Sequence, residues 1–415
     1  MQCRFCSSRL ETLFVSLGES ALSNAFLRKQ DVQRKELRFP LDVYVCGDCF
    51  LVQLPEYESP EKIFSDYAYF SSYSDTWLKH TKAYADQMAS MFSLSGTSRV
   101  VEIASNDGCL LKNFIDKGIP VLGIEPAANV ALVANRSGVP TQVIFFSEAT
   151  AKRLKEEGFA ADLLVGNNVL AHVPDINDFV KGLKILLKPA GVITMEFPHL
   201  MQLVQGNQFD TIYHEHFSYL SFITVEKIFT RQALTIFDVE ELPTHGGSLR
   251  IYARHSSDQE KGVSNRVSAL KAKELAGGFG SIHAYRAFQN NVQRIKQDTI
   301  DFLAGLKRQR KTIVGYGAPA KGNTFLNYCG IGTADIPYTV DKNPHKQGSF
   351  LPGSHIPIEN PEKIKETKPD YVLILPWNIK EEIMEQMSFI REWGGEFVTA
   401  IPQLKIHSKE VLEKV

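Results

Sequence analysis

The sequence predicts an α/β protein built of a small N-terminal metal-binding module, a central doubly wound Rossmann-like domain, and a second Rossmann-like α/β domain. Four cysteines, arranged as two Cys-x-x-Cys pairs, fall within the first 49 residues. Short apolar runs then alternate with helix-like segments over 99–196, and the same alternation returns over 312–399, which is typical of parallel sheets covered by helices. A chain of 415 residues also exceeds the length at which single cores stop growing, about 250–300 residues.

The composition excludes several function classes. The formal net charge is −1, so the chain lacks the basic excess that a nucleic-acid groove normally shows. It contains no apolar run near the roughly 20 residues that a membrane span needs, and its first residues show no apolar signal-peptide core. We therefore expect a cytoplasmic protein with neither nucleic-acid nor membrane partners, in which reduced cysteines bind metal instead of forming disulfides.

The N-terminal module is expected over residues 1–64. Its two cysteine pairs are Cys3 with Cys6 and Cys46 with Cys49, and an alternating segment over 39–45 leads into the second pair. Two such pairs can surround one Zn²⁺ with four thiolates, which closes the coordination shell and makes the zinc structural. The alternative is four unrelated buried thiols.

The central domain is expected over residues 65–256. It should open with a helix over 74–92, whose apolar residues recur at three- and four-residue steps. Strand and turn signals follow in order, with a helix expected after the first strand at 109–117 and a turn at 188–191. The expected strands are 99–103, 121–124, 161–165 and 192–196.

The rest of the chain divides into a polar helical connector over 257–310 and a C-terminal α/β domain over 311–415. In the second part we expect a strand, a glycine-bearing turn at 317–321 and a helix from 322. Further strands are expected at 337–340, 371–375 and 397–399.

The turn after the first strand of the central domain predicts a cofactor site. Glu102 lies in that strand, Asn106, Asp107 and Gly108 form the turn, and Glu125 ends the next strand, where a carboxylate can accept both hydroxyls of a ribose. A nicotinamide dinucleotide would need Gly-x-Gly-x-x-Gly, and Asp107 would repel its pyrophosphate. The acidic turn favours the sulfonium and amino-acid groups of S-adenosylmethionine, although an empty α/β domain stays possible.

The segment Tyr-His-Glu-His-Phe-Ser-Tyr over 213–219 is the richest cluster of reactive side chains. Its histidines are two positions apart, so they point to different faces of a helix and do not form the zinc motif His-Glu-x-x-His. We interpret the segment as an acid–base group in which Glu215 supports a histidine and Tyr213 donates to a developing oxyanion. His172, which follows another strand end, is a further candidate. The alternative is an aromatic packing segment.

These motifs together resemble the sugar C-methyltransferases of deoxysugar pathways. The likeness covers nearly the whole chain and rests on the four-cysteine module, on Tyr-x-Tyr-Phe-Ser-Ser-Tyr-Ser at 67–74, on Glu-x-x-Ser-Asn-Asp-Gly at 102–108, on Asn-Val-Leu-x-His at 168–172, on the 213–219 segment and on Gly-Tyr-Gly-Ala-Pro-Ala-Lys-Gly at 315–322. Ala104 departs from the pattern, because the family usually has glycine there. We expect its methyl group to be tolerated if the backbone φ angle is negative.

The resemblance implies a class I methyltransferase domain in the centre and roles for individual residues. It implies one structural zinc on the four cysteines, and S-adenosylmethionine bound by Glu102, Ala104, Asn106, Asp107, Gly108, Glu125, Pro126, Asn168, Tyr69 and Ser72. It makes His216 the general base, with Tyr213, Glu215, His172 and Tyr67 beside it. The implied substrate is a nucleotide-linked 4-keto-6-deoxy sugar carrying thymidine or guanosine diphosphate, held by Gly317, Lys321, Asn323 and His199.

The expected reaction is methylation of a carbon next to the 4-keto group, most readily C3, because the ketone makes that proton removable and spreads the charge as an enolate. Two alternatives stay open at this point. One is O- or N-methylation of a sugar or small molecule, which needs no enolate. The other is a zinc-organised binding protein with a degenerate cofactor fold, which would not bind S-adenosylmethionine.

Overall fold

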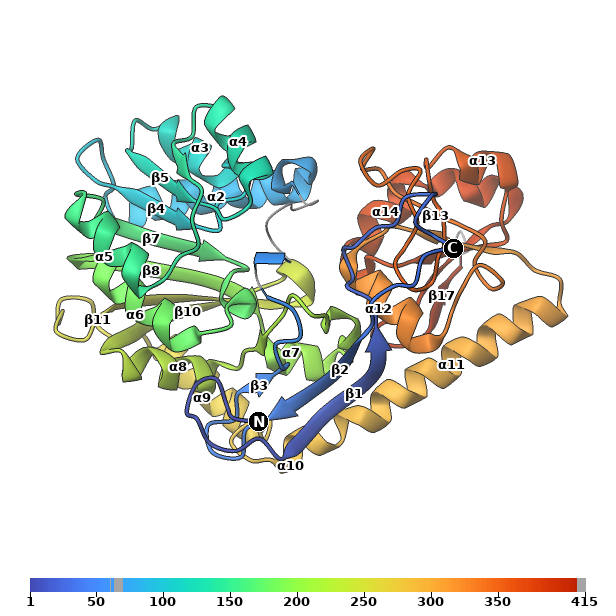
Figure 1. Cartoon of the computed structure of the whole chain (residues 1–415), viewed down its shortest axis with the longest axis horizontal. Coiled ribbons are helices and arrows are strands. Elements are labelled where there is room, and N and C mark those ends of the chain that lie inside the picture. The colour runs from blue at the N-terminus through green and yellow to red at the C-terminus, as the bar shows by residue number, and fades with distance from the viewer. Residues whose placement is uncertain (60, 63–69, 409–415) are drawn as a thin grey trace, which may run out of the picture. The chain divides into compact units, whose positions relative to one another are not determined.

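The computed structural model describes residues 1–59, 61–62 and 70–408, and this part of the chain forms two compact units (Figure 1). Unit 1 comprises Met1–Thr12, Tyr44–Met201 and Glu215–Ala284. Unit 2 comprises Leu13–Val43, Gln202–His214 and Tyr285–Val415. The boundary falls inside the Tyr-His-Glu-His string, so Tyr213 and His214 belong to unit 2, whereas Glu215 and His216 belong to unit 1.

The central sheet of unit 1 has, among the described residues, seven strands in the order β10-β11-β8-β7-β4-β5-β6. Strands β8 to β6 run parallel, and β11 pairs antiparallel with both β8 and β10. The strand order reverses at β4, which has β5 on one side and β7 on the other, and ligands of such sheets lie beyond the carboxyl ends at this point. The strands are β4 (Val100–Ile103), β5 (Val121–Ile124), β6 (Thr141–Gln142), β7 (Ala161–Asn167), β8 (Leu187–Pro198), β10 (Leu234–Leu242) and β11 (Ser248–His255).

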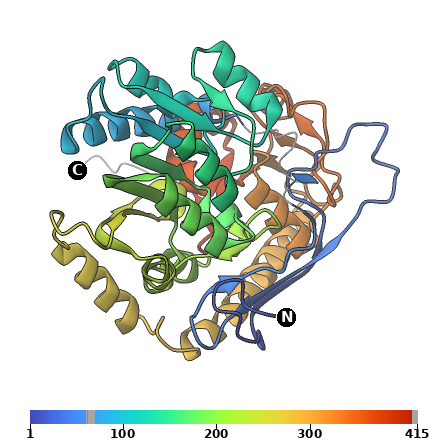
Figure 2. The same cartoon turned by 60° about the vertical axis from the view of Figure 1, so that its left-hand side comes forward.

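Helices cover both faces of this sheet because its strands are buried on both sides. Val100 packs with residues of α2 and α3, while its neighbour Val101 packs with residues of α5, α6 and α8 on the opposite face. Figures 1 and 2 show these layers from two directions. The helices of the unit are α2 (Asp75–Met91), α3 (Cys109–Ile115), α4 (Ala128–Arg136), α5 (Glu148–Glu156), α6 (Ile176–Leu186), α8 (Phe222–Arg231) and α9 (Asn265–Ala276).

Most predicted elements of this domain are confirmed to within a few residues. Helix α2 begins directly after Ser74, whose side chain accepts a hydrogen bond from the Trp77 N–H, as an N-cap residue does. The turn predicted at 188–191 lies within β8 as a bulge, because Leu187 pairs with Ala161 and Val192 already pairs with Leu163. The antiparallel strands β10 and β11 were not predicted, since strong charges interrupt their alternation.

Unit 2 contains a six-stranded sheet in the order β14-β13-β12-β15-β16-β17, counted over the described part of the chain. The sheet is parallel except for β17. Its strands are β12 (Ile313–Tyr316), β13 (Thr339–Val340), β14 (Ile358–Glu359), β15 (Tyr371–Ile374), β16 (Glu396–Thr399) and β17 (Lys405–His407). The helices are the long α11 (Phe288–Arg308), α12 (Ala320–Cys329), α13 (Lys363–Thr367) and α14 (Lys380–Gln386).

The N-terminal segment forms strand pairs with the part of the chain that directly follows His216. Strands β1 (Thr12–Ser20) and β2 (Phe39–Val45) are neighbours, and the last two residues of β2 pair with β3 (Val52–Gln53). Strand β3 in turn pairs with β9 (Ser218–Tyr219). The peptide N–H of Leu54 also donates to the carbonyl of Phe217 at 3.0 Å, so the metal-binding module holds the strand that follows the reactive string.

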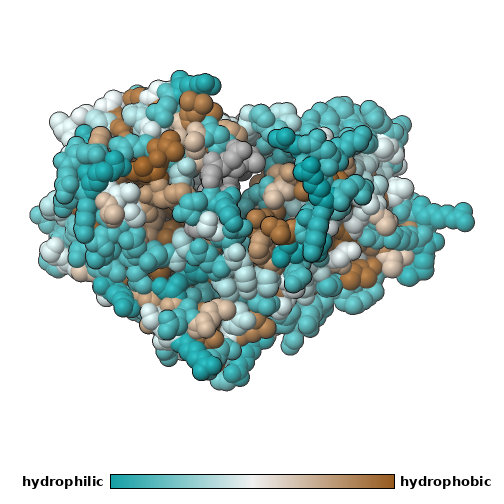
Figure 3. Space-filling model, in the orientation of Figure 1, coloured by the Kyte–Doolittle hydropathy of each residue, from teal (hydrophilic) through white to brown (hydrophobic). Residues whose placement is uncertain are grey.

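The face of the molecule seen in Figure 3 is mostly hydrophilic, with small hydrophobic patches. Within the described residues, no helix is long and apolar enough to cross a membrane. Short helices complete the fold, namely α7 (Leu200–Gln205) and α10 (His283–Arg286), with single 3-10 turns such as Leu170–His172 and Thr244–Gly246.

Candidate functional site

The four cysteines of the two predicted pairs form one cluster. The Sγ atoms of Cys3 and Cys49 are 3.6 Å apart, those of Cys6 and Cys46 are 3.5 Å apart, and all four lie within 4.8 Å of one another. A tetrahedron with Zn–S bonds of about 2.3 Å has edges of roughly 3.8 Å, so the four sulfurs fit one Zn²⁺. The Gln53 side chain donates to the Cys3 sulfur at 3.2 Å, as outer-shell groups commonly do for a metal ligand.

This metal cluster is packed against the central domain inside unit 1. The Thr224 hydroxyl of α8 donates to the Cys49 carbonyl at 3.2 Å, and Arg231 of the same helix donates to the Phe5 carbonyl at 3.2 Å. Arg4 donates to the carbonyl of Pro174, which precedes α6. Residues beside the metal ligands therefore form hydrogen bonds with α8 and with the loop before α6.

The predicted cofactor turn lies at the carboxyl end of β4 and is sharply folded. Ala104, Asn106 and Gly108 have φ angles of 57°, 51° and 79°, all in the left-handed region that favours glycine. The condition for tolerating the Ala104 methyl group, a negative φ, is not met, and the residue is held in a conformation that costs an L-residue about 1–2 kcal/mol. The turn keeps this shape because neighbouring groups hold it.

Those neighbours come from β5 and from the segment before α2. The Glu125 carboxylate accepts from the N–H of Asn106 and from the N–H of Ala127, both at 2.9 Å, across Pro126. The N–H groups of Ser71 and Ser72 donate to the side chains of Asn106 and Asp107, also at 2.9 Å. The predicted residues Tyr67 and Tyr69 lie outside the described residues.

The turn is strongly acidic and leaves acceptors unused. Burial, followed by the charges of Asp107 and Glu125, raises the pKa of Glu102 well above its usual value, and burial also raises the pKa of Glu125. Within the described part of the chain, buried oxygens of Glu102, Asp107 and Asn168 lack a hydrogen-bond partner. Such a set of acceptors fits a ligand that brings hydroxyl and ammonium donors and positive charge, which are the groups of S-adenosylmethionine.

The structure brings His172 and His216 together. Their ring centroids are 4.6 Å apart and the rings are nearly perpendicular, and the Phe217 N–H donates to the Ala171 carbonyl at 2.8 Å. His172 lies in the loop that follows β7, four residues after Asn168, and His216 is held beside it. Burial lowers the pKa of His172 to about 4, although a hydrogen bond to the Glu215 backbone opposes this shift, so His172 is neutral near pH 7.

Two other predicted residues have different surroundings. His199 is buried, and its Nε2 lies 2.6 Å from a Glu274 oxygen. Glu274 also accepts from the N–H groups of Phe222 and Ile223 at the start of α8. His199 thus belongs to a buried hydrogen-bond network that caps the start of α8. Tyr213 is half-buried in unit 2.

The three predicted residues of the C-terminal domain lie together around the start of α12. Gly317 has a φ of 91°, and a Cβ there would lie 2.5 Å from Pro376. The Lys321 ammonium donates to the Asn378 side chain at 2.8 Å and lies over the Trp377 ring at 4.6 Å. Asn323 is fully buried, and over the described residues its side-chain nitrogen has no partner. Burial lowers the pKa of Lys321.

A second half-buried lysine near this loop has no counterpart in the sequence analysis. Lys346 donates to the Ala318 carbonyl at 2.9 Å, and burial lowers its pKa. Lys346 lies outside any motif, and only the fold brings it to the 317–321 loop. Together with Lys321 it places two ammonium groups near the carboxyl edge of this sheet.

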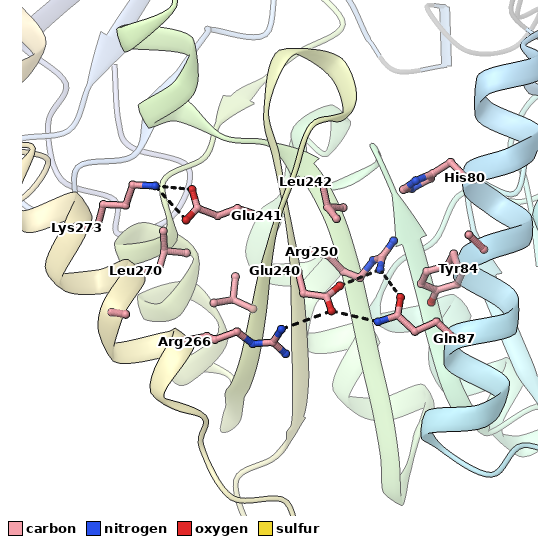
Figure 4. Close-up of a pocket in the computed structure, with 13 residues that line it drawn as sticks. His80, Tyr84, Gln87, Glu240, Glu241, Leu242, Arg250, Arg266, Leu270 and Lys273 are labelled. Carbon is pink, nitrogen blue, oxygen red and sulfur yellow. Dashed lines mark hydrogen bonds and ion pairs between the residues drawn. The ribbon is translucent and has the colours of Figure 1, made fainter.

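A cavity of about 590 Å³ lies elsewhere in unit 1, between α2, β10 and α9 (Figure 4). Its charged side chains are paired with one another: Arg250 contacts Glu196 at 2.5 Å and Glu240 at 3.0 Å, and Lys273 contacts Glu241 at 2.7 Å. Burial opposes ionisation of Glu196, but His80 and Arg250 outweigh it, and the pKa of Glu196 is lowered. We interpret this network as structural, with Glu196 at the carboxyl end of β8.

Three family models match successive parts of the chain. Residues 3–64 match the model described as "Putative zinc binding domain", residues 76–238 match "Methyltransferase domain", and residues 243–402 match "C-methyltransferase C-terminal domain". C-methyltransferase NovU of Streptomyces niveus is 35% identical over 409 residues, which span 99% of this chain and 97% of NovU.

More distant likenesses were also found. Ubiquinone biosynthesis O-methyltransferase of Agrobacterium fabrum is 22% identical over 47% of this chain and 64% of its own length. A solved S-adenosylmethionine-dependent methyltransferase from Clostridium acetobutylicum aligns with 43% of this chain and 92% of its own, at 13% identity and a TM-score of 0.36; no conclusion rests on that match. The similarity to NovU extends over the full chain, and the chain therefore belongs to the C-methyltransferase family that includes NovU and is an S-adenosylmethionine-dependent C-methyltransferase.

Proposed function

We propose that the enzyme methylates C3 of a nucleotide-linked 4-keto-6-deoxy sugar through an enolate. The observation that carries the proposal is the pair of histidine rings 4.6 Å apart beside the loop after β7. This loop neighbours the acidic turn after β4, because β7 and β4 are adjacent parallel strands. A base next to a methyl-donor site is what carbon methylation needs, since an unactivated carbon is not a nucleophile.

His216 is the proposed general base. It is 8% exposed and lies against His172, and imidazole is the side chain best matched to proton transfer near pH 7. Glu215 and Tyr213 are proposed to support it and to donate to the oxyanion. The proton leaves C3 to the imidazole, and the electron pair moves toward the 4-keto oxygen.

His172 is proposed to stabilise the enolate oxygen. A neutral imidazole donates one N–H without carrying charge, and its pKa of about 4 keeps it neutral at working pH. S-adenosylmethionine, when bound by the acidic turn, supplies the electrophilic methyl group. The chain's part is to hold the two reactants in line, an effect that contributes about 7–11 kcal/mol in well-oriented systems.

The cofactor contacts stay part of the proposal. We assign them to Glu102, Ala104, Asn106, Asp107, Gly108, Glu125, Pro126, Asn168 and Ser72, with Tyr69 and the proposed catalytic Tyr67 outside the described residues. The free acceptor atoms of Glu102, Asp107 and Asn168 support this assignment among the described residues.

The nucleotide is proposed to bind at the C-terminal α/β domain, over 311–415. Lys321 at the start of α12 and Lys346 beside Ala318 support an anionic ligand, because two ammonium groups near one loop can make charge-assisted hydrogen bonds to a diphosphate, in addition to their attraction to Asp210 and Asp341. Gly317 and Asn323 belong to the same proposed contact, and His199 is kept as a candidate for the sugar. We further propose a cytoplasmic enzyme, since metal-binding cysteines without disulfide bonds suit a reducing compartment.

Incubation with methyl-labelled S-adenosylmethionine and a panel of thymidine- and guanosine-diphosphate 4-keto-6-deoxy sugars tests the proposal. The label is expected at C3 by NMR, and C3–H should exchange in D₂O when the methyl donor is replaced by S-adenosylhomocysteine. Label on oxygen or nitrogen, without exchange, would refute the enolate route. His216→Asn should lose about 10²–10⁴ in kcat with unchanged cofactor affinity, and full turnover of this variant would remove His216 as the base.

A further inference from the structure

A histidine that no motif singled out lies against the proposed cofactor residue Asn168. His245 belongs to the 3-10 turn Thr244–Gly246, just before β11. Because β11 runs antiparallel to β8, with Ser248 opposite Pro198, the start of β11 meets the carboxyl ends of β8 and β7. The topology therefore brings His245 to the edge of the sheet where the cofactor turn lies.

The contact between the two side chains is specific. His245 Nε2 and Asn168 Nδ2 are 3.0 Å apart. The amide nitrogen of asparagine carries only donors, so Nε2 accepts, which requires a neutral imidazole with its proton on Nδ1. The amide of Asn168 is thereby oriented with its oxygen turned away from His245. That oxygen is buried and has no hydrogen-bond partner among the described residues.

Both residues stand in a strained backbone conformation. His245 and Asn168 each have a φ of 55°, and such conformations in residues other than glycine gather at binding and catalytic sites. The turn is fixed on both sides, since the Gly247 N–H donates to the Thr244 carbonyl at 2.9 Å and the Gly247 carbonyl accepts from the His199 N–H at 3.0 Å. The Asn168 N–H donates to the Glu196 carbonyl at 2.8 Å.

Aromatic packing further fixes the imidazole ring. The Trp77 ring of α2 lies 5.8 Å from the His245 ring and stacks on His80 at 5.1 Å. His80 in turn contacts the Glu196 carboxylate at 2.9 Å. The orientation of His245 is thus set by α2, β8 and its own turn, and its strained backbone places its ring against Asn168.

We propose that His245 is a positioning residue for S-adenosylmethionine, acting through Asn168: it accepts the Asn168 Nδ2–H hydrogen bond and so presents the Asn168 oxygen to a donor group of the cofactor, such as its ammonium. The inference rests on the proposed cofactor contact of Asn168. His245 itself touches neither the methyl group nor the sugar.

Calorimetric titration of the full zinc-loaded chain with S-adenosylmethionine tests this inference. His245→Gly removes the side chain but suits the positive φ, so the fold should persist. Its Kd is expected to rise about tenfold, as for a lost hydrogen bond. His245→Asn keeps an acceptor and tolerates the backbone, so it should recover part of the affinity. His255→Asn, at the other end of β11, is the matched control and should leave Kd unchanged.

The double variant separates the positioning role from a merely structural one. If His245 acts through Asn168, Asn168→Ala combined with His245→Gly binds no more weakly than Asn168→Ala alone. Additive losses, or a His245→Gly Kd within twofold of the parent while Asn168→Ala loses affinity, would overturn the role of His245. An unchanged Kd in Asn168→Ala would instead refute the proposed cofactor contact itself.

Discussion

Single residues in and beside the cofactor turn lower the folding stability of the free enzyme and favour ligand binding. Glu102 is buried close to Asp107 and Glu125, so its pKa is higher in the folded than in the unfolded chain. Below pH 4.5 the carboxyl is protonated in both states and costs nothing. As the pH rises through the unfolded pKa, only the unfolded chain ionises freely, and folding stability is lost. In return, the ionised carboxylate is a strong hydrogen-bond acceptor for a cationic ligand.

Glu102→Gln is therefore expected to melt like the parent at pH 4 and at a higher temperature at pH 7.5, by about 2–4 °C for each kcal/mol regained. Its Kd for S-adenosylmethionine should rise by about 10–100-fold, because hydrogen bonds to charged groups contribute roughly 1.5–3 kcal/mol. Calorimetric melting and titration measure both quantities. Exposed Glu260→Gln is the control. Equal melting of Glu102→Gln and parent at both pH values would contradict the account.

Ala104 gives a second prediction at the same turn. Its φ of 57° suits glycine, so Ala104→Gly should raise the free energy of unfolding by about 0.5–1 kcal/mol, after the entropy that glycine adds to the unfolded chain. Ala127→Gly, at a φ of −80°, should lower it instead. Urea titration compares the two variants, and a loss in both would show that the backbone at 104 is not strained.

The residue scale also shows what sequence reasoning could not reach. The paired cysteines predict their own cluster, because each Cys-x-x-Cys pair is local in the sequence and one Zn²⁺ takes four ligands, which joins the two pairs. The strain at Ala104 was missed, since the shape of this turn depends on contacts of Asn106 with Glu125 and with the Ser71 N–H, which are distant in sequence. His245 was missed for a similar reason: only the antiparallel return of β11 brings it to Asn168. The Thr-His-Gly-Gly turn was the available signal, because consecutive glycines permit positive φ.

At the scale of elements, one buried carboxylate joins three segments. Glu274 of α9 accepts from two N–H groups at the start of α8 and contacts His199 after β8. Helix α8 begins three residues after β9, which follows His216, so Glu274 fixes the chain on the far side of the reactive string. Helix α9 falls within the helical connector predicted over 257–310, whereas α8 was not predicted, and no local pattern shows that a carboxylate of α9 caps α8.

Glu274→Ala is expected to lower the free energy of unfolding by about 3–5 kcal/mol, because it leaves a buried histidine and two N–H groups without their acceptor. Lys273→Ala, which loses only an exposed ion pair with Glu241, should cost about 1 kcal/mol or less. Urea denaturation measures both. His199→Ala then decides the role of His199: a purely structural residue lowers stability and leaves the sugar KM unchanged, whereas a sugar contact raises KM.

At the scale of the whole molecule, the parallel sheets were predictable and the connections between distant segments were not. Short, mostly buried apolar runs such as 121–124 indicate parallel strands by themselves. The antiparallel extension β10-β11 contains the buried Arg250 and the half-buried Glu240, and the ion pair between them explains how these charges are accommodated. Likewise, the motif at 213–219 does not reveal that the two compact units meet within it along the chain.

The metal cluster is the clearest case of a distant connection, because residues 3–6 and 46–49 are linked to α8 and to the loop before α6. The sulfurs alone repel one another as thiolates, so the metal holds this set together. Removing zinc is therefore expected to loosen both the module and its contacts with α8, and through β3 the strand β9 next to His216.

Chelation with a strong zinc ligand, or Cys46→Ser, should reduce bound zinc from about one ion per chain and lower the melting temperature. Hydrogen exchange should quicken at the amides of Leu54 and Phe217, which donate to carbonyls of the linked segments. Cys329→Ala, a buried cysteine outside the cluster, should keep its zinc and those protected amides. Zinc content by mass spectrometry and exchange of the full chain read out the two effects. Loss of zinc with protected Leu54 and Phe217 amides would mean that the metal stabilises the module alone and not the strand beside the proposed base.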